Sequence, residues 1–285
     1  MFRSLLFIPG NNPSMIQNAD VFDSDAIIFD LEDSVDISEK DNARNLVREY
    51  LETSSTLPSF VVLRVNPLDT EFFRKDIALI LTRKVDYVLL PKATEDSLNI
   101  LEELLEEIER LNNLQKTKVI ALVESSKSII QIFKIACHKR VEAILLGAED
   151  LCSDLEIGRT NQGSEILFAR SRVIYACTGK NIISIDTPNT NIEDEELLRQ
   201  DCLNAKSLGM KAKSAIHPNQ LDIINEVFSP SKKEIEWSKR VLNAVEENIG
   251  KGAFSLDGKM IDKPIILKAE KIISKARKYN LWLMQ

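Results

Sequence analysis

The chain has 285 residues, of which 44% are hydrophobic and 28% charged, so it can bury one large core as an ordinary globular protein does. The net charge of −7 argues against nucleic acid as the main partner, and no apolar run reaches the roughly 18 residues that would predict a membrane span. Two histidines are too few for a His-rich zinc site, and four cysteines without a C-x-x-C pair are expected to be reduced, mostly buried thiols.

Eight short apolar runs bounded by turn residues follow one another along the chain and predict eight strands. They cover residues 4–9, 26–30, 60–66, 87–92, 119–125, 143–150, 182–187 and 211–217. Most are continuously apolar and do not alternate, which is typical of parallel strands that are covered on both faces. The eight units, each a strand followed by a helix, fill residues 1–228 and form the predicted barrel domain.

Helical patterns separate these strands. Ser38-Glu39-Lys40-Asp41 resembles a capping box before the second helix, and a leucine-rich stripe between residues 98 and 111 predicts a helix after the fourth strand. Ser125 or Ser126 is expected to cap the helix after the fifth strand. Residues 229–285 are expected to form a helical extension: one helix from residue 229 to about 248, an irregular stretch with a loop at 250–258, and a last helix from about Pro264.

The predicted fold class is α/β, a (β/α)₈ TIM barrel with a C-terminal helical extension. A doubly wound sheet is the alternative, but it normally carries a glycine-rich phosphate loop after its first strand. The sequence contains neither G-x-G-x-x-G nor the P-loop pattern, so the barrel is preferred. The N-terminus shows no signal-peptide cleavage site, and we expect a cytoplasmic protein.

In such a barrel the chemistry gathers at the carboxyl ends of the strands. Several carboxylates are expected to meet there, and they would repel one another unless a cation joined them. Carboxylates and water are the ligands that Mg²⁺ uses, and Glu124 and Asp150 end neighbouring strands, from which they could grip one ion. Taken singly, Asp30, Asp96 and Asp186 are more simply explained as helix caps or solvated surface groups.

Three other polar residues leave alternatives open. Arg64 lies in an apolar strand, which suggests a bidentate clamp on an anion, although a structural ion pair would also explain it. Lys92 could form a Schiff base, but pairing with a neighbouring carboxylate is the preferred interpretation. His217 is expected to be a hydrogen-bonded structural histidine and not a base.

Nine short runs in order along nearly the whole chain resemble the citrate lyase β-subunit family, within the metal-dependent barrel lyases that include malyl-CoA and citramalyl-CoA lyases. The runs occupy residues 3–13, 29–44, 64–66, 90–92, 124–125, 147–150, 168–170, 185–187 and 258–262. Any one run is a weak signal, but nine runs in the order found in the family are strong evidence for the resemblance. The eighth strand ends in His217-Pro218 where typical β-subunits carry Asn-Pro, and the loop at 159–165 is also modified, so the thioester carrier remains open.

The resemblance implies site residues. Glu124 and Asp150 would be ligands of Mg²⁺, or of Mn²⁺ in its place, and Glu32 and Asp33 would hold metal-bound waters. Arg64 would clamp the carboxylate of the keto-acid product. The remaining implied residues are Gly147 and Ala148 as backbone donors to that carboxylate, Lys92 near the rim, and Asp262 as an aspartate that reaches an adjacent subunit's site.

The implied reaction is cleavage of a citryl thioester to oxaloacetate and an acetyl thioester, in which an acid protonates the departing carbanion. Asp262 is the candidate acid, and the base is not assigned. The implied partners are an acyl-carrier protein or CoA, citrate lyase α and carrier subunits, and further copies of this chain, with a trimer favoured. The alternatives are a stand-alone citramalyl-CoA or malyl-CoA lyase and, from another class, a non-catalytic subunit that only binds a thioester partner.

Overall fold

The computed structural model describes residues 2–248 and 253–281. The chain separates into two compact units, Met1–Asn225 and Glu226–Gln285. Within the described ranges, no helix combines the length and the apolar character needed to cross a membrane.

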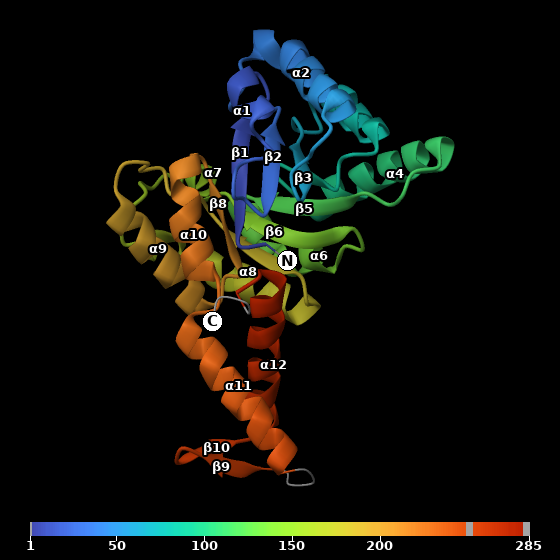
Figure 1. The fold of residues 1–285 in the computed structure, drawn as a ribbon. Coiled ribbons are helices and arrows are strands. Elements are labelled where there is room, and N and C mark those ends of the chain that lie inside the picture. The colour runs from blue at the N-terminus through green and yellow to red at the C-terminus, as the bar shows by residue number, and fades with distance from the viewer. Residues whose placement is uncertain (1, 249–252, 282–285) are drawn as a thin grey trace. The chain divides into compact units, whose positions relative to one another are not determined.

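The first unit is a closed barrel of eight parallel strands, as predicted (Figure 1). Each strand pairs with the next along the chain, and β1 also pairs with β8 to close the barrel. The strands are β1 (Ser4–Pro9), β2 (Ala26–Asp30), β3 (Val61–Arg64), β4 (Tyr87–Leu90), β5 (Lys118–Val123), β6 (Val141–Leu146), β7 (Ile183–Asp186) and β8 (Ala212–Ala215).

The predicted sixth strand was wrong at its carboxyl end. Strand β6 ends at Leu146, and helix α7 (Ala148–Asp154) begins two residues later, with Glu149 and Asp150 in its first turn. Acidic side chains near a helix N-terminus are favoured by the helix dipole, which explains why these residues do not continue the strand.

Helices lie outside the strands and cover the barrel (Figure 1). They are α1 (Pro13–Gln17), α2 (Lys40–Thr53), α3 (Phe73–Ile77), α4 (Glu95–Asn112), α5 (Ser126–Ile130), α6 (Ile132–Cys137), α8 (Leu167–Lys180), α9 (Glu195–Leu208) and α10 (Leu221–Phe228). Ser125 caps α5, as one of the two predicted alternatives. The predicted capping box at Ser38 was wrong, because Asp36 accepts the Ser38 N–H at the start of a short 3₁₀ turn that precedes α2.

The barrel interior is filled by apolar side chains, and its amino-terminal end is closed by three aromatic rings. Phe2, Phe60 and Tyr87 stand at the starts of their strands, with ring centroids 5.3 to 6.1 Å apart and edge-to-face geometry. Edge-to-face aromatic pairs stabilise a fixed arrangement of the rings, in addition to the stabilisation from the apolar area that they bury. The amino end of the barrel is therefore packed, which leaves the carboxyl end for a site.

The second unit contains α11 (Lys232–Glu247), β9 (Phe254–Leu256), β10 (Lys259–Ile261) and α12 (Lys263–Lys278). The two helices lie side by side and bury Val241 against Ala269 and Ile261 (Figure 1). Both predicted helices are present, and Ser231 caps the first. The stretch predicted to be irregular instead contains an antiparallel hairpin, because Asp257 and Gly258 adopt the positive φ angles that a tight hairpin turn requires. Gly250, Lys251 and Gly252 lie outside the described residues.

Candidate active site

A cavity of about 370 Å³ opens at the carboxyl ends of the barrel strands, where the sequence placed the chemistry. Six of the predicted site residues border it: Asp33, Arg64, Glu124, Gly147, Ala148 and Asp150. Phe7, Leu122, Leu145 and Ile216 contribute apolar wall. The cavity is thus apolar on its walls, with a small number of converging charged groups, which is the usual composition of a small-molecule site.

Arg64 holds three carboxylates. Its Nε and Nη2 donate to the two oxygens of Asp30 at 2.6 and 2.5 Å, while Nη1 donates to Asp33 at 3.2 Å and lies 2.9 Å from Glu32 Oε2. Asp30 is only 1% exposed, so its interpretation as a cap or surface group was wrong. Burial opposes the ionisation of Asp30, but the guanidinium outweighs it and keeps the pKa of this carboxyl below its usual value. All three guanidinium nitrogens of Arg64 are thus engaged by carboxylates, Nε and Nη2 by Asp30 and Nη1 by Glu32 and Asp33.

The loop after β2, which carries Glu32 and Asp33, is fixed from behind. Lys40 Nζ donates to the carbonyl oxygens of Leu31 and Glu32 at 2.8 and 2.6 Å, and Asn66 Nδ2 also donates to Leu31 at 2.8 Å. Glu32 is buried, and this burial raises its pKa to about 7. Asp33 is exposed at the rim.

Glu124 follows β5 and is 4% exposed. Its Oε1 accepts the backbone N–H of Lys92 at 2.7 Å, and burial, reinforced by the nearby Glu32 and Asp150, raises its pKa to about 8. Gly147 makes room for this side chain, because a Cβ there would lie 2.7 Å from Glu124 Cβ and 2.8 Å from Oε2. Glycine is therefore required at 147 for close packing against the carboxylate.

The two backbone amides predicted to bind a product carboxylate are used within the fold. Gly147 N donates to Val123 O at 3.0 Å, and Ala148 N donates to Thr187 Oγ1 at 3.3 Å. The expected donor role is corrected accordingly: Gly147 and Ala148 join β6 and α7 to the neighbouring strands β5 and β7. Asp150, two residues further along α7, is exposed at the cavity.

The side chains of three further predicted residues have other surroundings. The side chain of Lys92 is exposed and lies within ion-pair distance of no described carboxylate, so the preferred interpretation was wrong, although its charge lowers the pKa of Glu32; an exposed lysine also lacks the desolvation typical of a Schiff-base lysine. His217 Nδ1 accepts the Asn219 N–H at 3.2 Å, which confirms a structural role. Asp262 belongs to the second unit, where its carboxylate caps α12 through the Ile265 N–H at 3.3 Å.

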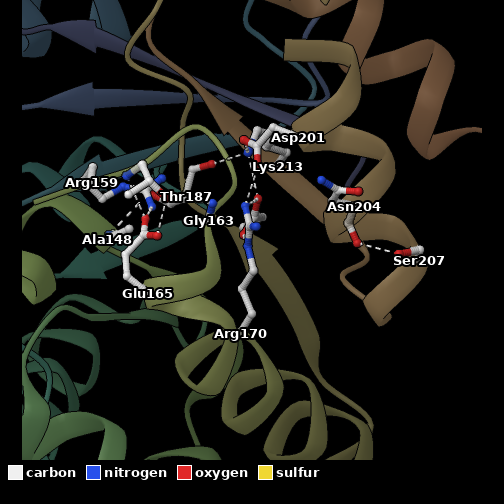
Figure 2. A network of polar contacts seen from close by, with 12 residues as sticks. Ala148, Arg159, Gly163, Glu165, Arg170, Thr187, Asp201, Asn204, Ser207 and Lys213 are labelled. Carbon is white, nitrogen blue, oxygen red and sulfur yellow. Dashed lines mark hydrogen bonds and ion pairs between the residues drawn. The ribbon is translucent and has the colours of Figure 1, made fainter. Parts of the chain in front are cut away.

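A second charged cluster is buried in the barrel unit next to Thr187 of the cavity wall, and sequence reasoning did not find it; Figure 2 shows Arg170, Asp201 and Lys213 converging there. Its members are Arg170 on α8, Asp186 on β7, Asp201 on α9 and Lys213 on β8. Asp186, like Asp30, is fully buried and is not the surface group expected from its sequence context. The available signal was a lysine inside the short strand Ala212–Ala215, where a buried ammonium requires acidic partners.

The carboxylates at the cavity fit a divalent cation. Among the described residues, Arg64 is the one cation that forms ion pairs with the carboxylates of Asp30, Glu32 and Asp33, so three carboxylates, including the buried Oε2 of Glu32, share one guanidinium. Among residues 2–248 and 253–281, no group of three or more His, Cys, Asp or Glu side chains is arranged to hold a metal. Mg²⁺ needs only one or two protein carboxylates and completes its shell with water and substrate.

Residues 3–218 match the family described as HpcH/HpaI aldolase/citrate lyase. The chain is 38% identical over 282 residues to citrate lyase subunit beta of Haemophilus influenzae, which covers 96% of this chain and 97% of that protein. It is 32% identical over 278 residues to a (3S)-malyl-CoA thioesterase of Cereibacter sphaeroides, with 96% and 94% covered. The crystal structure of CitE from Mycobacterium tuberculosis in complex with magnesium, acetoacetate and coenzyme A matches with a TM-score of 0.79 and 28% identity, over 96% of this chain and 97% of that one. As its motifs predicted, the chain belongs to the HpcH/HpaI aldolase/citrate lyase family.

Proposed function

We propose that this chain is a Mg²⁺-dependent carbon–carbon lyase that cleaves a citryl thioester to oxaloacetate and an acetyl thioester, as a citrate lyase β-subunit. The observation that carries the proposal is the excess of carboxylates around Arg64 in a closed-ended barrel cavity. Its support is the 38% identity, over nearly the full length of both chains, to a citrate lyase subunit beta.

Glu124 and Asp150 would hold the metal, with Mn²⁺ able to replace Mg²⁺, and Glu32 and Asp33 would hold its water ligands. A bound divalent cation supplies Lewis-acid polarisation of the substrate hydroxyl that becomes the keto oxygen. Without the cation, burial raises the pKa of Glu124 to about 8 and that of Glu32 to about 7, so at neutral pH Glu124 is mostly protonated and Glu32 only partly. Binding of a divalent cation at these carboxyl groups is therefore expected to release protons.

The chain's own residues would orient the substrate and move protons. Arg64, held by Asp30 through Nε and Nη2, would bind the carboxylate of the forming keto acid through Nη1 in place of the exposed Asp33. The hydroxyl proton leaves to a base, the O–H electron pair forms the new C=O bond, and the C–C bond pair passes to the thioester α-carbon. Asp262 is the proposed acid that protonates this carbon and so yields the acetyl thioester.

Asp262 lies in the second unit, outside the barrel, and we propose that it serves the cavity of a neighbouring copy. The protein would then be an obligate homo-oligomer, with a trimer favoured, that acts with citrate lyase α and acyl-carrier subunits. Residues 229–285 would be the extension that completes the neighbour's site. The four free cysteines support a cytoplasmic location, where thiols stay reduced.

A second candidate is a stand-alone citramalyl-CoA or malyl-CoA lyase. It is favoured by the 32% identity to a malyl-CoA thioesterase and by the coenzyme A in the similar CitE structure. The two candidates share the metal, the arginine and the bond that breaks. They differ in the acyl group and in its carrier.

The deciding experiment is to assay citryl, citramalyl and malyl thioesters, each on CoA and on acyl-carrier protein, with Mg²⁺ and with excess EDTA. We expect Mg²⁺-dependent release of oxaloacetate from the citryl thioester, and no activity in Glu124→Gln or Asp150→Asn. Glu109→Gln is a matched control, since this buried glutamate pairs with Arg140 at the amino end of β6, away from the cavity. Full activity in EDTA, or turnover of none of the three thioesters, would reject the proposal.

A further inference from the structure

The buried cluster next to Thr187 is compact and balanced in charge (Figure 2). Arg170 donates from Nε and Nη2 to both oxygens of Asp186 at 2.8 Å, and Nη2 also donates to Asp201 at 2.6 Å. Lys213 Nζ donates to the same two carboxylates, each at 2.7 Å. Burial lowers the pKa of Lys213, but Asp186 and Asp201 outweigh it, so the pKa of this lysine is raised and the ammonium is kept.

The third hydrogen bond of Lys213 leads out of the cluster toward the cavity. Its Nζ donates to the carbonyl oxygen of Thr187 at 2.7 Å, and Thr187 Oγ1 accepts the N–H of Ala148 at 3.3 Å. Ala148 is the first residue of α7, and Asp150 follows in the same helical turn. Thr187 is fully buried at the wall of the cavity, between Lys213 and Ala148.

We propose that Lys213 is a positioning residue for the metal site: through Thr187 it fixes Ala148, and thereby the first turn of α7 that presents Asp150 to the cavity. The inference rests on the proposed function, because it takes Asp150 to be a metal ligand. Lys213 donates its three hydrogen bonds to acceptors on α9, on β7 and in the loop after β7, so the ammonium connects that loop to a helix and a strand.

A purely structural role is the alternative. A buried ion pair is weak support for stability, because replacing it with apolar side chains of similar volume is often neutral. The barrel also holds a comparable buried pair with no route to the cavity. Arg140, beside the amino end of β6, donates from Nη1 and Nη2 to Glu109 at 2.9 Å. Arg140 is thus a control for the loss of a buried, paired cation.

The test measures Mn²⁺ binding to the full chain by calorimetry without substrate, after circular dichroism has confirmed folding. The variants are Lys213→Met, Thr187→Val, the double variant, Thr187→Ser and the control Arg140→Met. Partners that orient metal ligands typically contribute ten- to a hundredfold in affinity, so we expect Kd to rise about tenfold in Lys213→Met and in Thr187→Val. Thr187→Ser keeps the hydroxyl that accepts the Ala148 N–H, and Arg140→Met leaves the contacts from Lys213 through Thr187 to Ala148 intact. The Kd for Mn²⁺ of both variants should therefore stay within about twofold of the wild-type value.

The double variant separates a relay from two independent effects. If Lys213 acts through Thr187, the double variant binds Mn²⁺ no more weakly than the weaker single variant, whereas independent effects would multiply. A multiplied loss, or a folded Lys213→Met with unchanged Kd, overturns the proposal. If Lys213→Met does not fold, an unchanged Kd in Thr187→Val overturns it instead. Unchanged Mn²⁺ binding in Glu124→Gln marks a different failure, that of the proposed metal site itself.

Discussion

Replacing Glu124 with glutamine is expected to stabilise the metal-free protein while it abolishes activity. Burial raises the pKa of Glu124 from its ordinary 4.5 to about 8, so at pH 7 the folded carboxyl is protonated while the unfolded one is ionised. Taking up that proton at pH 7 costs about 3 kcal/mol of folding free energy, at 1.36 kcal/mol per pH unit. Glutamine avoids this cost, and its amide oxygen can still accept the Lys92 N–H. The expected gain is about 2 to 3 kcal/mol.

Because the pKa of Glu124 is raised in the folded state, the free energy of unfolding depends on pH in a definite direction. A carboxyl whose folded-state pKa is raised contributes stability that is fully present below pH 4.5 and is lost as the pH rises through about 8. The wild type should therefore lose stability relative to Glu124→Gln by up to about 1.4 kcal/mol per pH unit across that window. Glu32 is present in both proteins, and its charge enters the comparison only through its effect on the pKa of Glu124.

The assay is urea unfolding in EDTA at several values between pH 5 and pH 8. Circular dichroism is the suitable signal for the barrel, because the sequence has no tryptophan within residues 1–225. Glu109→Gln serves as control, since breaking its pair with Arg140 should lower stability throughout this range. Wild-type and Glu124→Gln stabilities that run parallel from pH 5 to pH 8 would refute the reasoning.

Three further predictions concern the cavity. Arg64→Lys should lower kcat/KM about ten- to a hundredfold in steady-state kinetics, because lysine cannot make the parallel pair to Asp30 and also face a ligand; a change under about twofold would contradict this. Gly147→Ala should weaken Mn²⁺ binding in calorimetry, since its Cβ would lie 2.7 Å from Glu124 Cβ, and an unchanged Kd would count against it. Mixing Asp262→Asn with Arg64→Ala subunits should restore about a quarter of native activity if Asp262 acts in a neighbour's site, whereas no recovery after verified mixing would exclude that arrangement.

Much of the fold was predictable because parallel strands buried on both faces are continuously apolar, and β1 and β2 have the predicted bounds. The carboxyl end of β6 could not be predicted, because the composition of Gly147-Ala148-Glu149-Asp150 fits the end of a strand and the start of a helix equally well. The hairpin at residues 254–261 was missed although Asp257-Gly258 is a strong turn signal. Its strands have only three residues each, too few to show a hydrophobic period.

The convergence of polar residues at one rim was predictable from topology, but their pairing was not. Asp30 and Arg64 stand opposite each other in the register between β2 and β3, and Asp186 and Lys213 do so between β7 and β8. The register between two neighbouring strands depends on how all the strands pack in the closed barrel, and it cannot be predicted from the sequence of one strand. For this reason the sequence placed Arg64 at the site but did not predict that Asp30 would take its bidentate edge.

The two charged groups of the barrel differ in the ratio of cations to carboxylates, and this difference indicates which of them is the functional site. In the buried cluster next to Thr187, two cations face two carboxylates, namely Arg170 and Lys213 with Asp186 and Asp201. At the cavity, Arg64 alone contacts three carboxylates, and burial raises the pKa of Glu32 to about 7 and that of Glu124 to about 8. A fold that only needed stability would not keep buried carboxylates short of positive charge, because each carries a desolvation cost. A bound divalent cation would supply positive charge to these carboxylates, and it can do so only where the cavity gives it access.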